Sequence, residues 1–195
     1  MPRQIVIIQG HPDPAGNHFC HALARAYAEG AKQAGHRVSE VEVAGLSFPL
    51  LRTQEAFEGG EVPDDIRKTQ ETIANAEHIV IVYPLWHGTM PALLKGYFEQ
   101  VFRYGFAMDK GDLNRMPRGL LTGKSARIVV TMGMPAVIYR WYFGAHSLKS
   151  LERNILRLAG IRPIRETLIG RVHALKPEKR EKWLTKMRAL GERVF

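Results

Sequence analysis

The chain has 195 residues, of which 45% are hydrophobic and 24% are charged, and its formal net charge is +9. This composition is typical of a globular protein with one large core, so we predict a single domain over residues 1–195. No apolar run approaches the roughly 18 residues of a membrane span, and the N-terminus shows no signal-peptide pattern. The single cysteine, Cys20, excludes an internal disulfide, so we expect a cytoplasmic protein.

The N-terminal half of the chain alternates strand-like runs with helical periodicity. Ile5–Ile8 is apolar and β-branched, which predicts a strand buried on both faces. A helical apolar stripe runs from Phe19 to Ala34, and Gly35 ends it. Arg37–Val43 alternates apolar and polar residues, as an edge strand with one open face does. A weaker helix is predicted over Asp64–Asn75.

The C-terminal half holds two more buried strands, a second alternating strand and three helical stripes. The buried strands are Ile79–Tyr83 and Arg127–Thr131, and the alternating run is Pro163–Ile169. The helical stripes begin after proline or end before glycine: 94–102 after Pro91, 148–158 before Gly160, and 183–190 after Pro177.

These elements alternate as β and α throughout, which indicates a parallel sheet covered on both faces by helices. The first, third and fourth strands have buried patterns, and the second and fifth have edge patterns. The order 2-1-3-4-5 satisfies both patterns and predicts a flavodoxin-like, three-layer α/β/α fold with a five-stranded parallel sheet. The aperiodic stretches Gly45–Pro63 and Tyr104–Lys124 are expected to be functional loops.

Ligands of such sheets bind at the carboxyl ends of the strands, where the loops after the first, third and fourth strands meet. The first of these loops opens a helix, so backbone amides near Gly16, Asn17 and His18 favour a phosphate. The loop after the third strand is apolar and aromatic, with Trp86 between Pro84 and Gly88. A surface turn of this kind predicts a bed for a planar ring, because burying such a ring contributes about 5 kcal/mol.

Several segments resemble a known family. They are "YPLWHGTMPALLKGYFEQVF" at 83–102, "GFAMDKG" at 105–111 and "LLTGKSARIVVT" at 120–131. Over Arg3 to about Ile169 the chain resembles the NAD(P)H:quinone oxidoreductases of the diaphorase type, in particular their short bacterial members. The resemblance implies a bound flavin, FMN or FAD, and NADH or NADPH as electron donor. It also implies ping-pong, two-electron reduction of quinones or similar electrophiles, and a homodimer with its site at the subunit interface.

The resemblance also implies roles for particular residues. One group matches the cofactor-binding positions of the family: His11, Asn17, His18 and Phe19 at the phosphates, Pro84, Leu85, Trp86, His87 and Gly88 under the isoalloxazine, and Thr131 and Gly133 in the third loop. His146, in "GAH", matches a histidine that stabilises charge on the reduced flavin together with a tyrosine. Tyr139 is the better match for that tyrosine, and Tyr142 competes with it.

Two departures from the family pattern lie in these loops. Cys20 stands where family members commonly have Asn, and "TMGMP" replaces a T-x-G-G sequence. Pro135 has no amide hydrogen to donate, so we expect this chain to lack one or more of the family's backbone contacts to the pyrimidine edge of the flavin. We predict that Cys20 is a small buried residue on the first helix.

Other functions fit the sequence less well. His18, Cys20 and His21 do not share one helical face, so no metal site is expected. "GLLTGKS" precedes a strand, whereas a P-loop follows one. The basic residues are scattered, which disfavours nucleic-acid binding, and the positive charge disfavours a flavodoxin-type electron carrier. A flavin-binding ancillary subunit that docks on a membrane transport system is the alternative of a different class.

Overall fold

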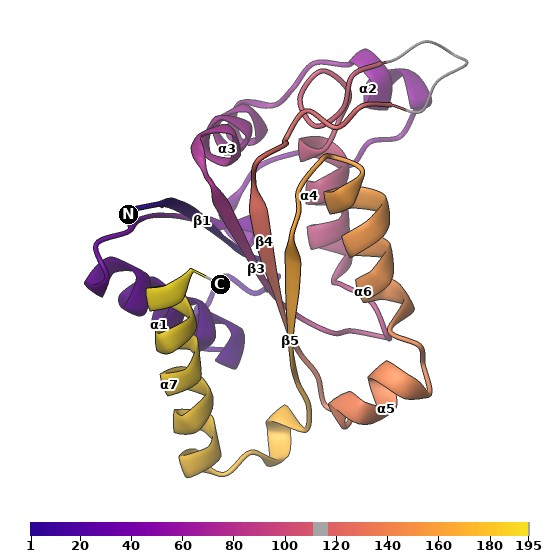
Figure 1. Cartoon of the computed structure of the whole chain (residues 1–195). Helices are drawn as coiled ribbons and strands as arrows, with labels where there is room; N and C mark the ends of the chain where they lie inside the picture. Colours follow the sequence, from indigo (N-terminus) through magenta and orange to yellow (C-terminus); the bar gives the residue numbers. More distant parts are fainter. Residues whose placement is uncertain (111–116, 195) are drawn as a thin grey trace.

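The computed structural model describes residues 1–110 and 117–194, in which two helical layers enclose a parallel sheet (Figure 1). The sheet has five strands in the order β2-β1-β3-β4-β5, and every neighbouring pair is parallel. The strands are β1 (Gln4–Gln9), β2 (Arg37–Glu42), β3 (His78–Pro84), β4 (Ser125–Thr131) and β5 (Ile164–Ile169). The predicted order and the flavodoxin-like architecture are confirmed.

The burial of each strand follows its hydrophobic pattern. Every residue of β3 and β4 is buried, whereas β2 buries only Val41 and β5 alternates. Central strands need apolar side chains on both faces because helices cover both faces, and edge strands keep one side toward solvent.

Helices cover the two faces unequally. Helices α1 and α7 pack together on one face, and α3, α4 and α6 lie on the other (Figure 1). The helices are α1 (Phe19–Gln33), α2 (Gln54–Gly59), α3 (Asp64–Asn75), α4 (Ala92–Val101), α5 (Ala136–Trp141), α6 (His146–Ser150) and α7 (Pro177–Arg193), with the 3-10 turns η1 (Val43–Gly45) and η3 (Val172–Ala174) and the π-helix η2 (Leu151–Arg157).

The contact between α1 and α7 depends on two glycines. A Cβ atom on Gly30 would lie 2.0 Å from the carbonyl oxygen of Arg188. A Cβ atom on Gly191 would lie 2.1 Å from the carbonyl oxygen of Tyr27. Only glycine permits this approach of the two backbones in the C-terminal halves of α1 and α7. Near their starts, Arg180 of α7 lies over the Phe19 ring of α1.

Short elements depart from the sequence prediction. The stretch Gly45–Pro63 contains α2, whose N-terminus is capped by Thr53 Oγ1 accepting from Ala56 N at 3.1 Å. The helical stripe predicted over 148–158 is α6 continued by the π-helix η2. Helix α5 was not predicted. Part of the predicted loop Tyr104–Lys124, residues 111–116, lies outside the described residues. Among the residues described, no helix has the length and apolarity needed to cross a membrane.

Candidate functional site

A cavity of about 300 Å³ lies at the carboxyl ends of β1, β3 and β4. All the predicted cofactor-binding residues except His87 and Gly88 line it: His11, Asn17, His18, Phe19, Pro84, Leu85, Trp86, Thr131 and Gly133. The structure adds residues that the sequence did not single out for this site: Cys20, Met132, Val172, His173 and Arg180. The cavity therefore gathers the three predicted loops and one further segment after β5.

The first loop, residues 10–18, is held by short-range polar contacts. Asp13 accepts from Ala15 N at 2.9 Å, and its Oδ2 lies 2.6 Å from Nε2 of His18. His11 accepts the Asp13 amide on Nδ1 at 3.1 Å, and its ring stacks on that of His18 with 3.9 Å between centroids. Burial and the neighbouring imidazoles lower the pKa of His11 to about 4, so His11 is neutral near pH 7.

The N-terminus of α1 opens into this cavity without a side-chain cap. His18, the N-cap residue, makes no side-chain capping hydrogen bond, and the first turn carries no acidic residue. The first amides of a helix need external acceptors, and the helix dipole makes an anion the favoured one. Phe19 and Cys20 of this first turn line the cavity, so the donor set fits a phosphate.

Cys20 lies at the floor of the cavity as a protonated thiol. Its Sγ is 3.1 Å from Oγ1 of Thr131, which joins α1 to the end of β4. Burial raises the pKa of Cys20 to about 12, so the reactive thiolate is not formed near neutral pH. The prediction that Cys20 is a small buried residue is confirmed.

A tight hairpin turn presents Trp86 beside the cavity. The backbones of Trp86 and Thr89 exchange two hydrogen bonds of 2.8 and 2.9 Å. Between them His87 and Gly88 both have positive φ values, 48° and 79°, which is the backbone of a type I′ turn. Trp86 is 49% exposed, so its ring is not a core residue. His87 and Gly88 shape the turn, which explains why they do not line the cavity.

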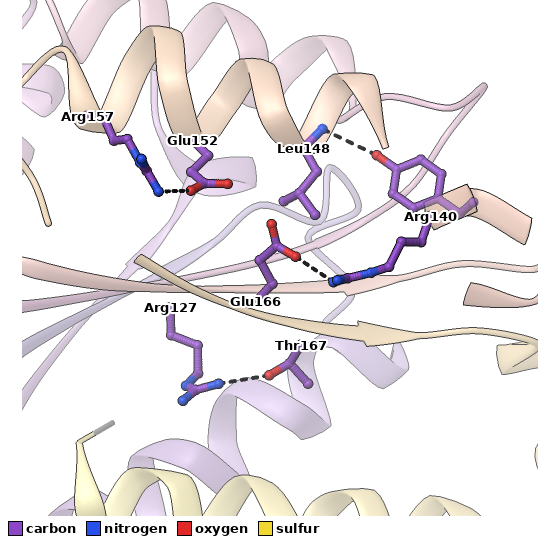
Figure 2. A network of polar contacts seen from close by, with 8 residues as sticks. Arg127, Arg140, Leu148, Glu152, Arg157, Glu166 and Thr167 are labelled. Atoms are coloured by element: carbon purple, nitrogen blue, oxygen red, sulfur yellow. Dashed lines mark hydrogen bonds and ion pairs between the residues drawn. The ribbon is translucent and has the colours of Figure 1, made fainter. Parts of the chain in front are cut away.

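Tyr139 and His146 stand apart from the cavity lining. Tyr139 is buried, and its hydroxyl accepts from the amide of Leu148 at 3.3 Å, the bond drawn at Leu148 in Figure 2. Burial raises the pKa of Tyr139. His146 is the exposed first residue of α6, and Tyr142 is 82% exposed. The catalytic roles of Tyr139 and His146 stay predictions.

Arg180 brings a cation to the cavity from α7. Its guanidinium lies 5.4 Å from the centre of the Phe19 ring and donates to the carbonyls of Val172 and Leu175 at 3.1 and 3.3 Å. In the sequence Arg180 is one of many basic residues in a polar helix, so no local signal distinguishes it. Only the packing of α7 on α1 brings it to the site.

An ion pair between α5 and the edge strand β5 holds the segment that follows β4. Arg140 donates to Glu166 Oε2 at 2.6 Å, across from the pair of Glu152 and Arg157 (Figure 2). Burial raises the pKa of Glu166. Helix α5 and the two residues after it expose five large apolar side chains: Val137, Ile138, Trp141, Tyr142 and Phe143. Within the part of the chain that the structure describes, no cluster of His, Cys, Asp and Glu is suited to a metal ion.

Comparison with known proteins gives consistent results. A family described as having the flavodoxin-like fold matches residues 3–192. A protein of Haemophilus influenzae, described as an uncharacterized NAD(P)H oxidoreductase, is 29% identical over 90% of this chain and 88% of its own length.

Solved structures also align over the whole chain. An NAD(P)H:quinone oxidoreductase from Methanothermobacter marburgensis matches with a TM-score of 0.83 and 24% identity, over 100% of this chain and 98% of its own. An FMN-dependent NADH-azoreductase from Bacillus anthracis, solved in complex with FMN, matches with a TM-score of 0.73 and 17% identity, over 100% and 99%. At these identities the structural likeness establishes the fold.

Proposed function

The chain belongs to the family with the flavodoxin-like fold, and from that premise we propose that it is an NAD(P)H-dependent flavin oxidoreductase that reduces quinones or similar electrophiles. The observation that carries the proposal is the cavity itself, in which an uncapped helix N-terminus and an apolar, aromatic turn face one another. One end suits a phosphate and the other a flat ring, which is the pattern of a flavin nucleotide. The relatives' names support the proposed reaction.

The residues that would hold the flavin follow from the lining of the cavity. The amides of Asn17 to Cys20 and the Arg180 guanidinium would bind the phosphate, and Pro84, Leu85 and Trp86 would support the ring from one side. Thr131 and Gly133 would contact the ring edge. When bound, a flavin accepts a hydride from the nicotinamide and passes two electrons to an acceptor in a second, ping-pong step.

The chain itself supplies orientation and one proton-exchanging group. The turn at Trp86 fixes a flat surface on which two planar reactants bind in succession, and stacking brings the reacting atoms to roughly 3–3.5 Å. His146 can donate a proton or a hydrogen bond at an imidazole nitrogen and offset negative charge as it develops. Tyr139, whose hydroxyl already accepts from Leu148, would act behind His146.

We propose FMN as the cofactor, with FAD as the second choice. The azoreductase with the same fold was solved with FMN, and its name specifies NADH as the donor. Titration with each nicotinamide in turn distinguishes NADH from NADPH as the donor for this chain.

We propose that the active form is a homodimer with the site at the interface. The exposed apolar residues of α5 follow directly from the loop containing Gly133, so a subunit covering them would also cover the open side of the cavity. Exposed aromatic side chains gathered within a few residues, as Trp141, Tyr142 and Phe143 are, are typical of protein interfaces. The free, buried thiol of Cys20 supports a cytoplasmic location.

The reported relatives are each described as an oxidoreductase or a reductase, which favours an enzyme over an ancillary transport subunit.

An anaerobic absorbance titration tests the proposal. The purified protein is loaded with FMN, titrated with NADH and separately with NADPH, and then mixed with a benzoquinone, while mass spectrometry identifies the flavin that heating releases. Bleaching of the flavin band by a nicotinamide and its recovery with the quinone are expected. A protein that binds neither FMN nor FAD, or whose flavin neither nicotinamide reduces, would contradict the proposal.

A further inference from the structure

We propose that Thr89, Ser147 and Tyr139 are positioning residues, which together fix the start of α6, and with it His146, against the Trp86 turn. The inference rests on the proposed flavin reaction, and it assigns to these residues a task beyond binding the flavin. Thr89 and Ser147 are 58 residues apart in sequence and do not line the cavity.

The central contact is a hydrogen bond between two side chains. The Ser147 hydroxyl donates to Oγ1 of Thr89 at 2.9 Å. Thr89 closes the Trp86 turn through two backbone hydrogen bonds, and Ser147 follows His146 directly in α6. One bond therefore connects the residue after His146 to the residue that closes the turn carrying Trp86.

Tyr139 holds the same helix end through separate contacts. Its hydroxyl accepts from Leu148 N at 3.3 Å, and its backbone carbonyl accepts from Ala145 N at 3.0 Å (Figure 2, at Leu148). The Tyr139 side chain is 1% exposed, so its own position is set by core packing. Leu148 N belongs to the first turn of α6, where amides have no acceptor within the helix, and Tyr139 supplies one.

The backbone at this point needs such support. Gly144 and Ala145 both lie in the left-handed region, with φ values of 61° and 49°. Ala145, the N-cap residue of α6, has no side-chain polar atom with which to cap the helix. A non-glycine residue in this conformation costs roughly 1 kcal/mol, and surrounding contacts must hold it. Ser147 and Tyr139 hold the residues on each side of His146.

The consequence concerns catalysis more than flavin affinity. Without the bond between Ser147 and Thr89, the Trp86 turn and the start of α6 can move independently. His146 and the ring surface would then spend less time in their productive relative position, and a small misplacement in a reactive complex slows the chemical step. We expect a fall in kcat, with a smaller change in KM and in the affinity for FMN.

A double-mutant cycle on the FMN-loaded protein tests this. Ser147→Ala and Thr89→Val each remove one partner, and we expect each to slow flavin bleaching by NADH about three- to tenfold. The double variant is expected to be no slower than the slower single variant, because both remove the same bond. Ser147→Thr keeps the hydroxyl and should restore most of the rate. Ser150→Ala, in the same helix, is the matched control.

A second readout needs no flavin. Amide hydrogen exchange at Thr89 and Leu148 should be several-fold faster in both single variants of the apoprotein, with exchange in β4 unchanged. Unchanged exchange, or bleaching rates equal to those of the wild type or additive in the double variant, would overturn the positioning role. Wild-type protein whose flavin is not bleached by either nicotinamide would instead contradict the proposed function, so the two failures are distinguishable.

Discussion

The two sides of the cavity are built in different ways. The first-loop side, residues 10–20, is backed by α1 and α7, and His11 and Cys20 are buried there. The aromatic side, formed by the Trp86 turn and, beyond the cavity lining, by α5 and the start of α6, leaves Trp86, Trp141 and Tyr142 exposed. The first-loop side is complete within one chain, whereas the aromatic side presents apolar surface that a ligand or a second subunit would cover.

This difference separates two kinds of sensitivity. Changes behind the first-loop side should act through the stability of the chain, because His11, Cys20 and the contact of α1 with α7 are buried. Changes on the aromatic side should act through association and reaction, because its residues are fixed by few contacts. The following predictions test that separation.

The largest effect is expected at the contact of α1 and α7 behind the first loop. Gly30→Ala places a Cβ atom 2.0 Å from the carbonyl oxygen of Arg188, and neither backbone can shift freely. We expect the free energy of unfolding, measured by urea denaturation, to fall by about 3 kcal/mol. In a helix free of this contact, the same change would be favourable by about 1 kcal/mol.

Gly96→Ala is the matched control, since Gly96 lies in α4 and its Cβ would meet only the side chain of the exposed Leu50 at 2.7 Å, apart from a contact with Phe48 at 3.8 Å. Equal destabilisation of both variants would show that the close crossing of α1 and α7 is not required.

The next effect concerns the exposed face of α5. Trp141→Asp puts a charge among the exposed apolar residues, where Trp141 is 80% exposed. We expect the dissociation constant of the dimer, measured by analytical ultracentrifugation, to rise about 100-fold, because central aromatic residues dominate interfaces. The urea midpoint of the monomer should be unchanged, since Trp141 lies outside the core. A monomeric wild type would contradict the proposed dimer.

Trp86 is the residue of the aromatic side that lines the cavity, so its removal should affect flavin binding directly. We expect Trp86→Ala to weaken FMN binding about thirtyfold, because the ring loses its stacking surface. Fluorescence titration of the apoprotein with FMN measures the change. Leu120→Ala, at another exposed apolar position away from the cavity lining, is the control. Full flavin affinity and turnover in Trp86→Ala would show that the turn is not the flavin bed.

Substitution of His146 should lower the rate of flavin reduction and leave the affinity for flavin nearly unchanged. We expect His146→Ala to slow flavin reduction about tenfold, because one donor to developing charge is lost. Stopped-flow absorbance under anaerobic conditions measures reduction and reoxidation separately. If both rates equal those of the wild type, His146 has no role in the reaction.

The smallest effect is the dependence of stability on pH. Burial lowers the pKa of His11 to about 4 and that of His78 to about 3, from 6.5 in the unfolded chain. The unfolded chain therefore binds more protons below pH 6.5, so stability should fall as the pH drops from 6.5 toward 4. We expect a loss of about 1 kcal/mol in the free energy of unfolding between pH 7 and pH 6, from urea denaturation. The slope should be shallower in His11→Asn, and an equal slope would contradict the burial of a neutral His11.

The sequence by itself determined the sheet and the place of the cavity. Apolar runs such as Ile79–Tyr83 report burial on both faces, and alternating runs such as Arg37–Val43 report one open face, so strand order followed from local patterns. The turn at Trp86 could also be predicted, because proline and glycine beside aromatic residues at a strand end favour a turn over a regular helix or strand.

Only the tertiary structure decided which distant side chains complete the site. Arg180 reaches the first loop because α7 packs on α1, and the packing of α5 beside α6 brings the Tyr139 hydroxyl to the amide of Leu148. The bond between Ser147 and Thr89 joins two loops that no sequence periodicity connects. Periodicity records which face of an element is buried, but the identity of the residue across a contact depends on how whole elements pack.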